Sequence, residues 1–211
     1  MCSSDLHAWG MREVDMTALV RYREANRDDF RARHGIGLSY LPFVVQVLCD
    51  ALRKHPYLNS SWTDEGILLR GPINLGVAVA LPDALLVPVI RDADRLGLVD
   101  IARALHDLSN RARSRTLRPE DVRDGTFTLN NTGAIGSVLG MSIINHPQAA
   151  ILSTEAIVRR PVVVGDTVEV RDVMYLALSF DHRVIDGLQA GQFMDEVEHG
   201  LERWTPAAIR L

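Results

Sequence analysis

Residues 168–187 read VEVRDVMYLALSFDHRVIDG, a long apolar run that ends in a group of charged residues. The run as far as Phe180 is typical of a largely buried strand, because branched and aromatic residues suit the pleated surface of a sheet. A short polar connection follows, and the residues from Gly187 to about Trp204 predict a final helix. His182 is therefore expected at the end of a buried strand, where loops often carry active sites.

The residues before this strand predict an alternation of strands and helices. Strands are expected at 8–14, 67–69, 73–81, 85–90, 126–129, 149–157 and 162–164, the last joined to the 168–180 strand by a Gly165-Asp166 hairpin turn. Helices are expected at 17–33 and 98–112, where apolar residues recur every three or four positions, and at 40–52, a run that is apolar on nearly every face and is expected to be buried. Ser39 suits the N-cap of the second helix and Gly35 the end of the first. The apolar strands between 67 and 90 suggest burial on both faces. A single α/β domain is expected.

Composition excludes several classes of protein. The chain has 211 residues, of which 47% are hydrophobic and 24% charged, so it can bury a sizeable core. Its net charge of −4 does not provide the positive potential that attracts the phosphate backbone, so nucleic acid is not expected as a partner. The longest apolar stretch, 75–90, contains two prolines and an aspartate, so no membrane span is expected. With only Cys2 and Cys49, a disulfide framework is excluded, which favours a reducing compartment and a cytoplasmic location.

Common site motifs are absent from the sequence. It contains no GxGxxG, GxxxxGK[ST], HExxH, GxSxG or CxxC. None of the seven histidines is paired at a metal-ligand spacing, so no metal is expected, and His182 is distinguished only by its neighbours. Asp186, with Gln189 three residues later, fits an N-cap and capping box for the last helix. Asp186 can serve as a helix cap or as a support for the site, and the sequence favours neither role over the other. The two roles are compatible.

DHRVIDG at 181–187 resembles the DHRxxDG signature of the catalytic domain of dihydrolipoyl acyltransferases, the core components of 2-oxo-acid dehydrogenase complexes. Four further stretches follow that family's order and spacing: INLGVAVALPDALLVPVI (73–90), PVIRDAD (88–94), FTLNNTGAIGS (127–137) and IINHPQAAIL (143–152). The resemblance implies a catalytic domain over 7–211, preceded by residues 1–6 that lie outside the family pattern. The family's lipoyl and peripheral-subunit-binding domains, and its basic N-terminal arm, are expected to be absent.

The resemblance also implies an architecture and a reaction. The expected fold is like that of chloramphenicol acetyltransferase, a two-layer α/β sandwich with a mixed sheet flanked by helices. The expected assembly is a homotrimer with active sites between subunits, and trimers build cubic or dodecahedral cores. The implied activity is acyl transfer between dihydrolipoamide and coenzyme A, in a complex of the pyruvate or branched-chain type. The lipoyl group would then come from another domain or chain.

Three residues carry the implied chemistry. By the resemblance, His182 is the general base that takes a proton from the attacking thiol, and Asp186 holds its loop. The family's oxyanion donor is commonly a hydroxyl in an F-T-x-[ST]-N-x-G strand end, contributed by the neighbouring subunit. Asn130 occupies that position here, and its amide N–H can donate a hydrogen bond, so Asn130 is the predicted donor. Asn131 is expected to shape the turn. Backbone N–H groups are the alternative donors.

Two other functions stay open at this stage. One is a coenzyme A-dependent acetyltransferase with a different acceptor, against which the extended family motifs argue. The other is a catalytically weak scaffold subunit, against which the retention of His182 argues. The acyl group, whether acetyl, succinyl or branched-chain, and the contacts to coenzyme A are not determined by the sequence. Lys54, the only lysine, lies at a helix end beside His55 and is not expected to carry a lipoyl group.

Overall fold

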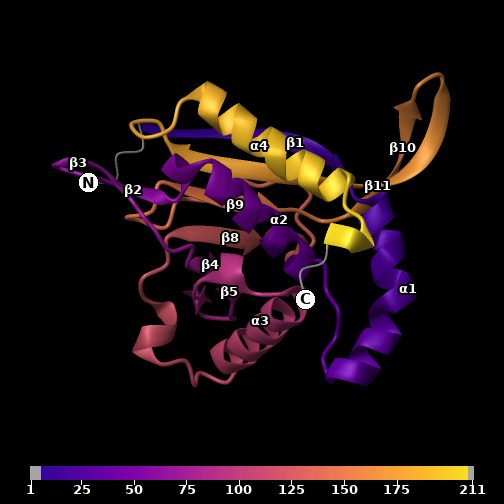
Figure 1. Ribbon diagram of the computed structural model, residues 1–211, viewed down its shortest axis with the longest axis horizontal. Coiled ribbons are helices and arrows are strands. Elements are labelled where there is room, and N and C mark those ends of the chain that lie inside the picture. The colour runs from indigo at the N-terminus through magenta and orange to yellow at the C-terminus, as the bar shows by residue number, and fades with distance from the viewer. Residues whose placement is uncertain (1–5, 209–211) are drawn as a thin grey trace.

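A seven-stranded mixed sheet underlies the structure, a computed structural model that describes residues 6–208 (Figure 1). The strand order is β1-β11-β9-β8-β4-β7, with β10 paired to the projecting part of β11. The strands are β1 (His7–Asp15), β2 (Ser60–Thr63), β3 (Gly66–Leu69), β4 (Leu75–Val77), β5 (Val79–Ala80), β6 (Leu85–Leu86), β7 (Val89–Ile90), β8 (Phe127–Asn131), β9 (Ala150–Thr154), β10 (Val158–Val164) and β11 (Thr167–Asp181). The helices are α1 (Thr17–His34), α2 (Leu41–Lys54), α3 (Leu98–Arg113) and α4 (Gly187–Glu202).

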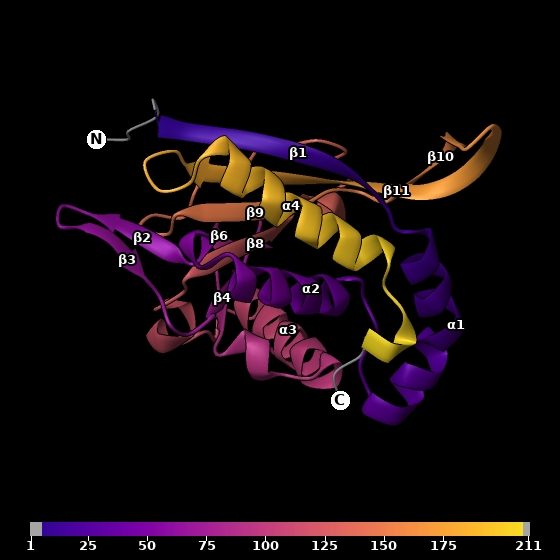
Figure 2. The same cartoon turned by 45° about the horizontal axis from the view of Figure 1, so that its top comes forward.

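Helices α2, α3 and α4 cover one face of the sheet, with α2 in the middle (Figure 2). Because α2 is covered by its neighbours and by the sheet, it is apolar on nearly every side, as its sequence predicted. Helix α1 packs beside α4 and β11 and ends at Gly35, whose φ of 73° is the left-handed conformation typical of a helix end. The two layers confirm the expected α/β fold.

Strand β11 is the longest strand of the main sheet and ends at Asp181, directly before His182. It pairs with β1 and β9 along its C-terminal half and with β10 along its N-terminal half, which projects from the body as a two-stranded ribbon (Figure 2). The predicted hairpin is confirmed, because Val164 pairs with Thr167 and Gly165 has a φ of 60°. The same strand therefore reaches from an exposed ribbon to the centre of the core.

Two expectations about the strands between 67 and 90 are wrong, the second of them only in part. The long strands predicted at 73–81 and 85–90 each break in two, so that β4 and β7 join the main sheet while β5 and β6 pair only with each other. The predicted burial on both faces holds for β4 and β7, all of whose residues are buried. It fails for β6, where Leu85 is 62% exposed, and for β3, whose three apolar residues are all exposed. Strand β3 pairs only with the unpredicted β2, and β6 only with β5, so neither strand is flanked on both edges as a central strand of the main sheet is.

The predicted N-cap of the second helix is also wrong. Tyr40, and not Ser39, occupies the N-cap position, and its side chain makes no capping hydrogen bond. The Tyr40 carbonyl accepts hydrogen bonds from the N–H groups of Phe43 and Val44, and Pro42 in the first turn has no N–H to satisfy. A side-chain cap is therefore not needed.

None of the helices within residues 6–208 is long and apolar enough to cross a membrane. Cys49 is buried in α2. Residues 1–5, which include Cys2, lie outside the described residues, and so do the expectations that concern them.

Candidate functional site

His182 begins the loop between β11 and α4. Its backbone N–H donates to the Leu6 carbonyl at 2.8 Å, and its ring centroid lies 5.7 Å from that of Phe180. The residue itself is exposed. A histidine whose backbone is anchored at a strand end and whose residue is exposed can exchange a proton with a bound substrate.

The turn that carries His182 is held by hydrogen bonds within its own residues. The N–H groups of Val184 and Ile185 both donate to the Asp181 carbonyl at 3.0 Å. The Asp181 carboxylate accepts from the Arg183 backbone N–H at 3.0 Å and from its guanidinium at 3.0 and 2.6 Å. Partial burial raises the pKa of Asp181, but the hydrogen bonds and charge of Arg183 outweigh it, so the pKa is below its usual value. Arg183 also lies over the Trp62 ring of β2, 5.0 Å from its centroid.

Asp186 ends this turn and caps α4. Its Oδ1 accepts from the Gln189 backbone N–H at 2.8 Å, and the Gln189 side-chain oxygen accepts from the Asp186 N–H at 3.0 Å. The predicted capping box is thus confirmed. Because the cap determines where α4 starts, it also determines where the turn before α4 must end.

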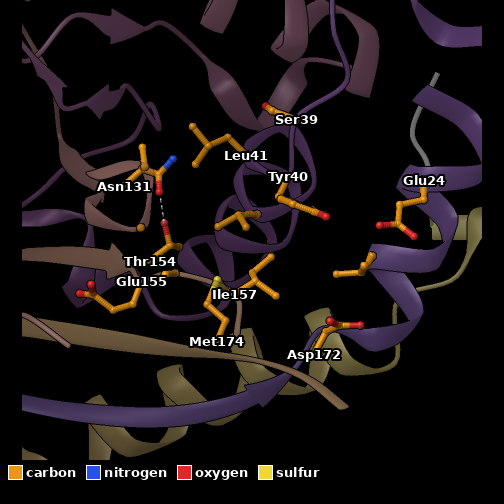
Figure 3. A pocket seen from close by; sticks show the side chains of 15 residues that line it. Glu24, Ser39, Tyr40, Leu41, Asn131, Thr154, Glu155, Ile157, Asp172 and Met174 are labelled. Atoms are coloured by element: carbon orange, nitrogen blue, oxygen red, sulfur yellow. Dashed lines mark hydrogen bonds between the residues drawn. The ribbon is translucent and has the colours of Figure 1, made fainter. Parts of the chain in front are cut away.

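Asn130 lies near the end of β8, where side chains from three segments meet. Its Nδ2 donates to Ser142 Oγ at 2.8 Å, and Ser142 Oγ is 2.7 Å from Ser153 Oγ on β9. Asn131 points to the other face of the sheet, where its amide oxygen accepts from Thr154 Oγ1 at 3.4 Å (Figure 3). Asn131 is the N-cap residue of the following 3-10 turn (Thr132–Ile135), and its side chain makes no capping hydrogen bond there. Its expected role in shaping that turn stays a prediction.

A hollow of about 430 Å³ lies beside Asn131, between the start of α2, α1 and the end of β9 (Figure 3). Glu155 lines it and is buried, with Oε2 accepting from Thr132 Oγ1 at 2.6 Å and Oε1 without a hydrogen-bond partner among the described residues. Sequence reasoning did not single out Glu155, because an isolated glutamate after a strand has no motif. Neither His182 nor Asn130 lines this hollow.

His182 and Asn130 belong to opposite ends of the sheet within one chain. Asn130 is level with Ser153, and Ser153 is level with Ala177 of β11. His182 is about five residues beyond Ala177, which at about 3.3 Å per residue is roughly 16 Å along the strand direction. The two side chains therefore cannot contact one small group in the same subunit. The roles predicted for His182, Asp186 and Asn130 stay predictions. The separation adds one condition, that His182 and Asn130 can act on the same group only if they come from different subunits.

Two curated relatives resemble nearly the whole chain. The lipoamide acyltransferase component of the branched-chain alpha-keto acid dehydrogenase complex of Bacillus subtilis is 45% identical over 197 residues, covering 93% of this chain and 46% of that protein. The dihydrolipoyllysine-residue acetyltransferase component of the pyruvate dehydrogenase complex of Corynebacterium glutamicum is 40% identical over 198 residues, 91% of this chain and 29% of that protein. The chain thus spans less than half the length of these relatives.

Solved structures agree with the fold. A probable dihydrolipoamide acetyltransferase from Listeria monocytogenes matches with a TM-score of 0.94 and 45% identity over 97% of this chain and 88% of that one. The cubic core of a pyruvate dehydrogenase multienzyme complex matches with a TM-score of 0.89 and 32% identity over 93% of this chain and 81% of that one.

The dihydrolipoamide acetyltransferase of Azotobacter vinelandii, solved to study a serine, a histidine and an asparagine in its catalytic mechanism, has the same TM-score of 0.89, with 31% identity over 93% of this chain and 81% of that one. Chloramphenicol acetyltransferase, with a TM-score of 0.59 and 18% identity over 93% of this chain and 88% of that one, shares the fold. The model of the family described as 2-oxoacid dehydrogenases acyltransferase (catalytic domain) matches residues 2–209. The chain belongs to this family of 2-oxoacid dehydrogenase acyltransferase catalytic domains.

Proposed function

We propose that this chain transfers an acyl group between coenzyme A and dihydrolipoamide, in a 2-oxo-acid dehydrogenase complex of the pyruvate or branched-chain type. The observation that carries the proposal is His182, exposed at the end of β11 on a turn held by Asp181, Arg183 and Asp186. The relatives from Bacillus and Corynebacterium support the reaction class. The serine, histidine and asparagine of the Azotobacter enzyme also have the same sequence separations as Asn130, His182 and Asp186.

The chemistry requires a base for a thiol. A thiol with a pKa of about 8.5 is mostly protonated at neutral pH, whereas an imidazole with a pKa of about 6.5 is largely free to accept its proton. As the thiol proton moves to His182, the sulfur forms a bond to the thioester carbon and the carbonyl electron pair moves onto oxygen. When this intermediate collapses, the other carbon–sulfur bond breaks, and the leaving thiolate takes the proton back from His182. The reverse reaction uses the same groups.

The site requires more than one copy of the chain. Because His182 and the Asn130 end of β8 lie roughly 16 Å apart along the strand direction, they can reach one carbonyl only if they come from neighbouring subunits. We therefore propose a homotrimer with its active sites between subunits, able to assemble into a larger core. The similar cubic core supports this arrangement. The lipoyl group would be delivered by another domain or chain.

The test measures acyl transfer from acetyl-coenzyme A and from isobutyryl-coenzyme A to free dihydrolipoamide. The wild-type chain is expected to be active as a trimer, and His182→Ala is expected to lose about 10²–10⁴-fold in rate without a change in sedimentation. His106→Ala, which removes an exposed histidine of α3, is the matched control and should retain full activity. An inactive wild-type trimer, or equal rates for wild type and His182→Ala, would overturn the proposal.

A further inference from the structure

Three polar side chains form a connected network at the end of β8. Asn130 Nδ2 donates to Ser142 Oγ at 2.8 Å, and Ser142 Oγ lies 2.7 Å from Ser153 Oγ. Asn130 and Ser153 are level with each other on adjacent strands. Because side chains alternate along a strand, both point away from the core face that holds Leu129 and Leu152. Ser142 comes from the long loop between these strands and completes the network.

Burial decides the direction of the hydrogen bond between the two serines. Ser153 is 0% exposed, and among the described residues its side chain is bonded only to Ser142. If Ser142 donated to Ser153, the Ser153 proton would be buried without an acceptor, at a cost of about 1–3 kcal/mol. If Ser153 donates to Ser142, this cost is avoided. Ser153 is therefore the donor of this pair.

This direction leaves the Ser142 proton available. The Ser142 oxygen accepts one hydrogen bond from the Asn130 amide and one from the Ser153 hydroxyl, so both of its lone pairs are used. Its own O–H must then point to an acceptor outside the network. Hydrogen bonds in series polarise one another, which makes this O–H a stronger donor than an isolated hydroxyl. Ser142 is only partly buried, so a ligand can reach it.

We propose that Ser142 is the oxyanion donor of the acyl-transfer reaction, and that Asn130 and Ser153 are positioning residues that orient its hydroxyl. This inference rests on the proposed function. It accounts for the asparagine at a position where the family pattern commonly has a hydroxyl, because the Asn130 amide holds the hydroxyl of another residue. One of the two amide protons of Asn130 is already donated to Ser142.

Ser142 takes no covalent part in the reaction. As the sulfur–carbon bond forms and the carbonyl electron pair moves onto oxygen, the Ser142 O–H donates a hydrogen bond to that oxygen and keeps its proton. The thiol proton moves to His182 of a neighbouring copy as the sulfur–carbon bond forms, and it passes to the leaving thiolate when the intermediate collapses. Because the negative charge exists only in the transition state and the intermediate, the hydrogen bond is strongest there and accelerates the reaction.

The experiment compares steady-state kinetics of wild type, Ser142→Ala, Ser142→Thr and Asn130→Ala, each shown to be a trimer by sedimentation. Ser142→Ala is expected to lower kcat by about 10²–10³-fold with KM for both substrates unchanged, because the lost bond belongs to the transition state. Ser142→Thr keeps a hydroxyl and should retain kcat within about tenfold. Asn130→Ala removes one orienting bond, so its loss should be about tenfold.

Ser137→Ala is the matched control, because Ser137 lies in the same loop and its side chain is not part of the network. It should leave kcat unchanged. The inference is overturned if Ser142→Ala retains kcat within threefold of wild type, or if Asn130→Ala loses more than Ser142→Ala. Wild-type activity that depends on His182 but not on Ser142 would overturn this inference alone, whereas an inactive wild-type trimer would overturn the proposed function.

Discussion

The two strand ends that carry the proposed chemistry are built differently. At the end of β11, Asp181 bonds Arg183 and Asp186 bonds Gln189, so the turn that carries His182 is held by residues two or three positions apart. At the end of β8, the Asn130 amide bonds Ser142, 12 residues along the chain, and Ser142 in turn bonds a serine of β9. The first end is built mainly from local hydrogen bonds, to which the Leu6 carbonyl and the Trp62 ring add contacts from distant segments. The second end exists only once distant segments have come together.

Packing at the two ends differs in the same way. A Cβ added at Gly187, beside the His182 turn, would meet nothing within 4 Å. A Cβ added at Gly133, just after β8, would lie 2.4 Å from the backbone carbon and oxygen of Glu155. The β8 end therefore depends on a close approach of two backbone segments. The β11 end does not.

Gly133→Ala should give the largest effect on stability. The added methyl group cannot fit without moving the backbone at Glu155, so the free energy of unfolding should fall by about 3 kcal/mol. Urea denaturation checks this, with Gly187→Ala as the matched control, which should change stability by less than about 1 kcal/mol in either direction. Similar losses in the two variants would show that the two ends do not differ in packing.

Removal of Arg183 should have the next largest effect. Arg183 is a surface residue, but it holds Asp181 through two guanidinium nitrogens and also lies over the Trp62 ring. Arg183→Met should therefore lower the free energy of unfolding by about 1–2 kcal/mol at pH 7. Arg103→Met, which removes an exposed ion pair on α3, should cost no more than about 0.5 kcal/mol.

The same variant tests the pH dependence. Because the pKa of Asp181 is lower in the folded protein, its contribution to stability is present above the unfolded value of 3.8 and is lost as the pH falls through the folded value. Urea midpoints of wild type and Arg183→Met should therefore converge as the pH falls below about 4. A difference that is the same at pH 3 and pH 7 would mean that the Asp181 charge does not contribute.

The smallest effect is expected at Asp186. Asp186→Ala removes the N-cap of α4 and should cost about 1 kcal/mol, whereas Asp186→Asn keeps a good cap and should be nearly neutral in stability and in kcat. Thermal denaturation and the acyl-transfer assay check both variants. If Asn impairs kcat as much as Ala does, the charge of Asp186 acts on the site beyond its capping role.

The parts of the fold that could be predicted are those specified by short-range patterns. The spacing of apolar residues identified α1, α3 and α4, and the Gly165-Asp166 turn identified the β10–β11 hairpin. The capping box at Asp186 could also be predicted from the sequence, because all of its atoms lie within four residues. Strand β2 was not predicted, because three of its four residues, Ser60, Ser61 and Thr63, are polar and give no apolar strand pattern. It forms a two-stranded sheet with β3, apart from the main sheet.

By itself, the sequence determined the family, the α/β class and the turn that presents His182, because these depend on residues close together in the chain. Tertiary structure alone decided the other half of the proposed site. The break between β4 and β5, the exposure of Leu85 and the partners of Asn130 depend on which segments lie side by side. Strand register places Ser153 level with Asn130 and roughly 16 Å from the His182 end, and no spacing along the chain encodes that register.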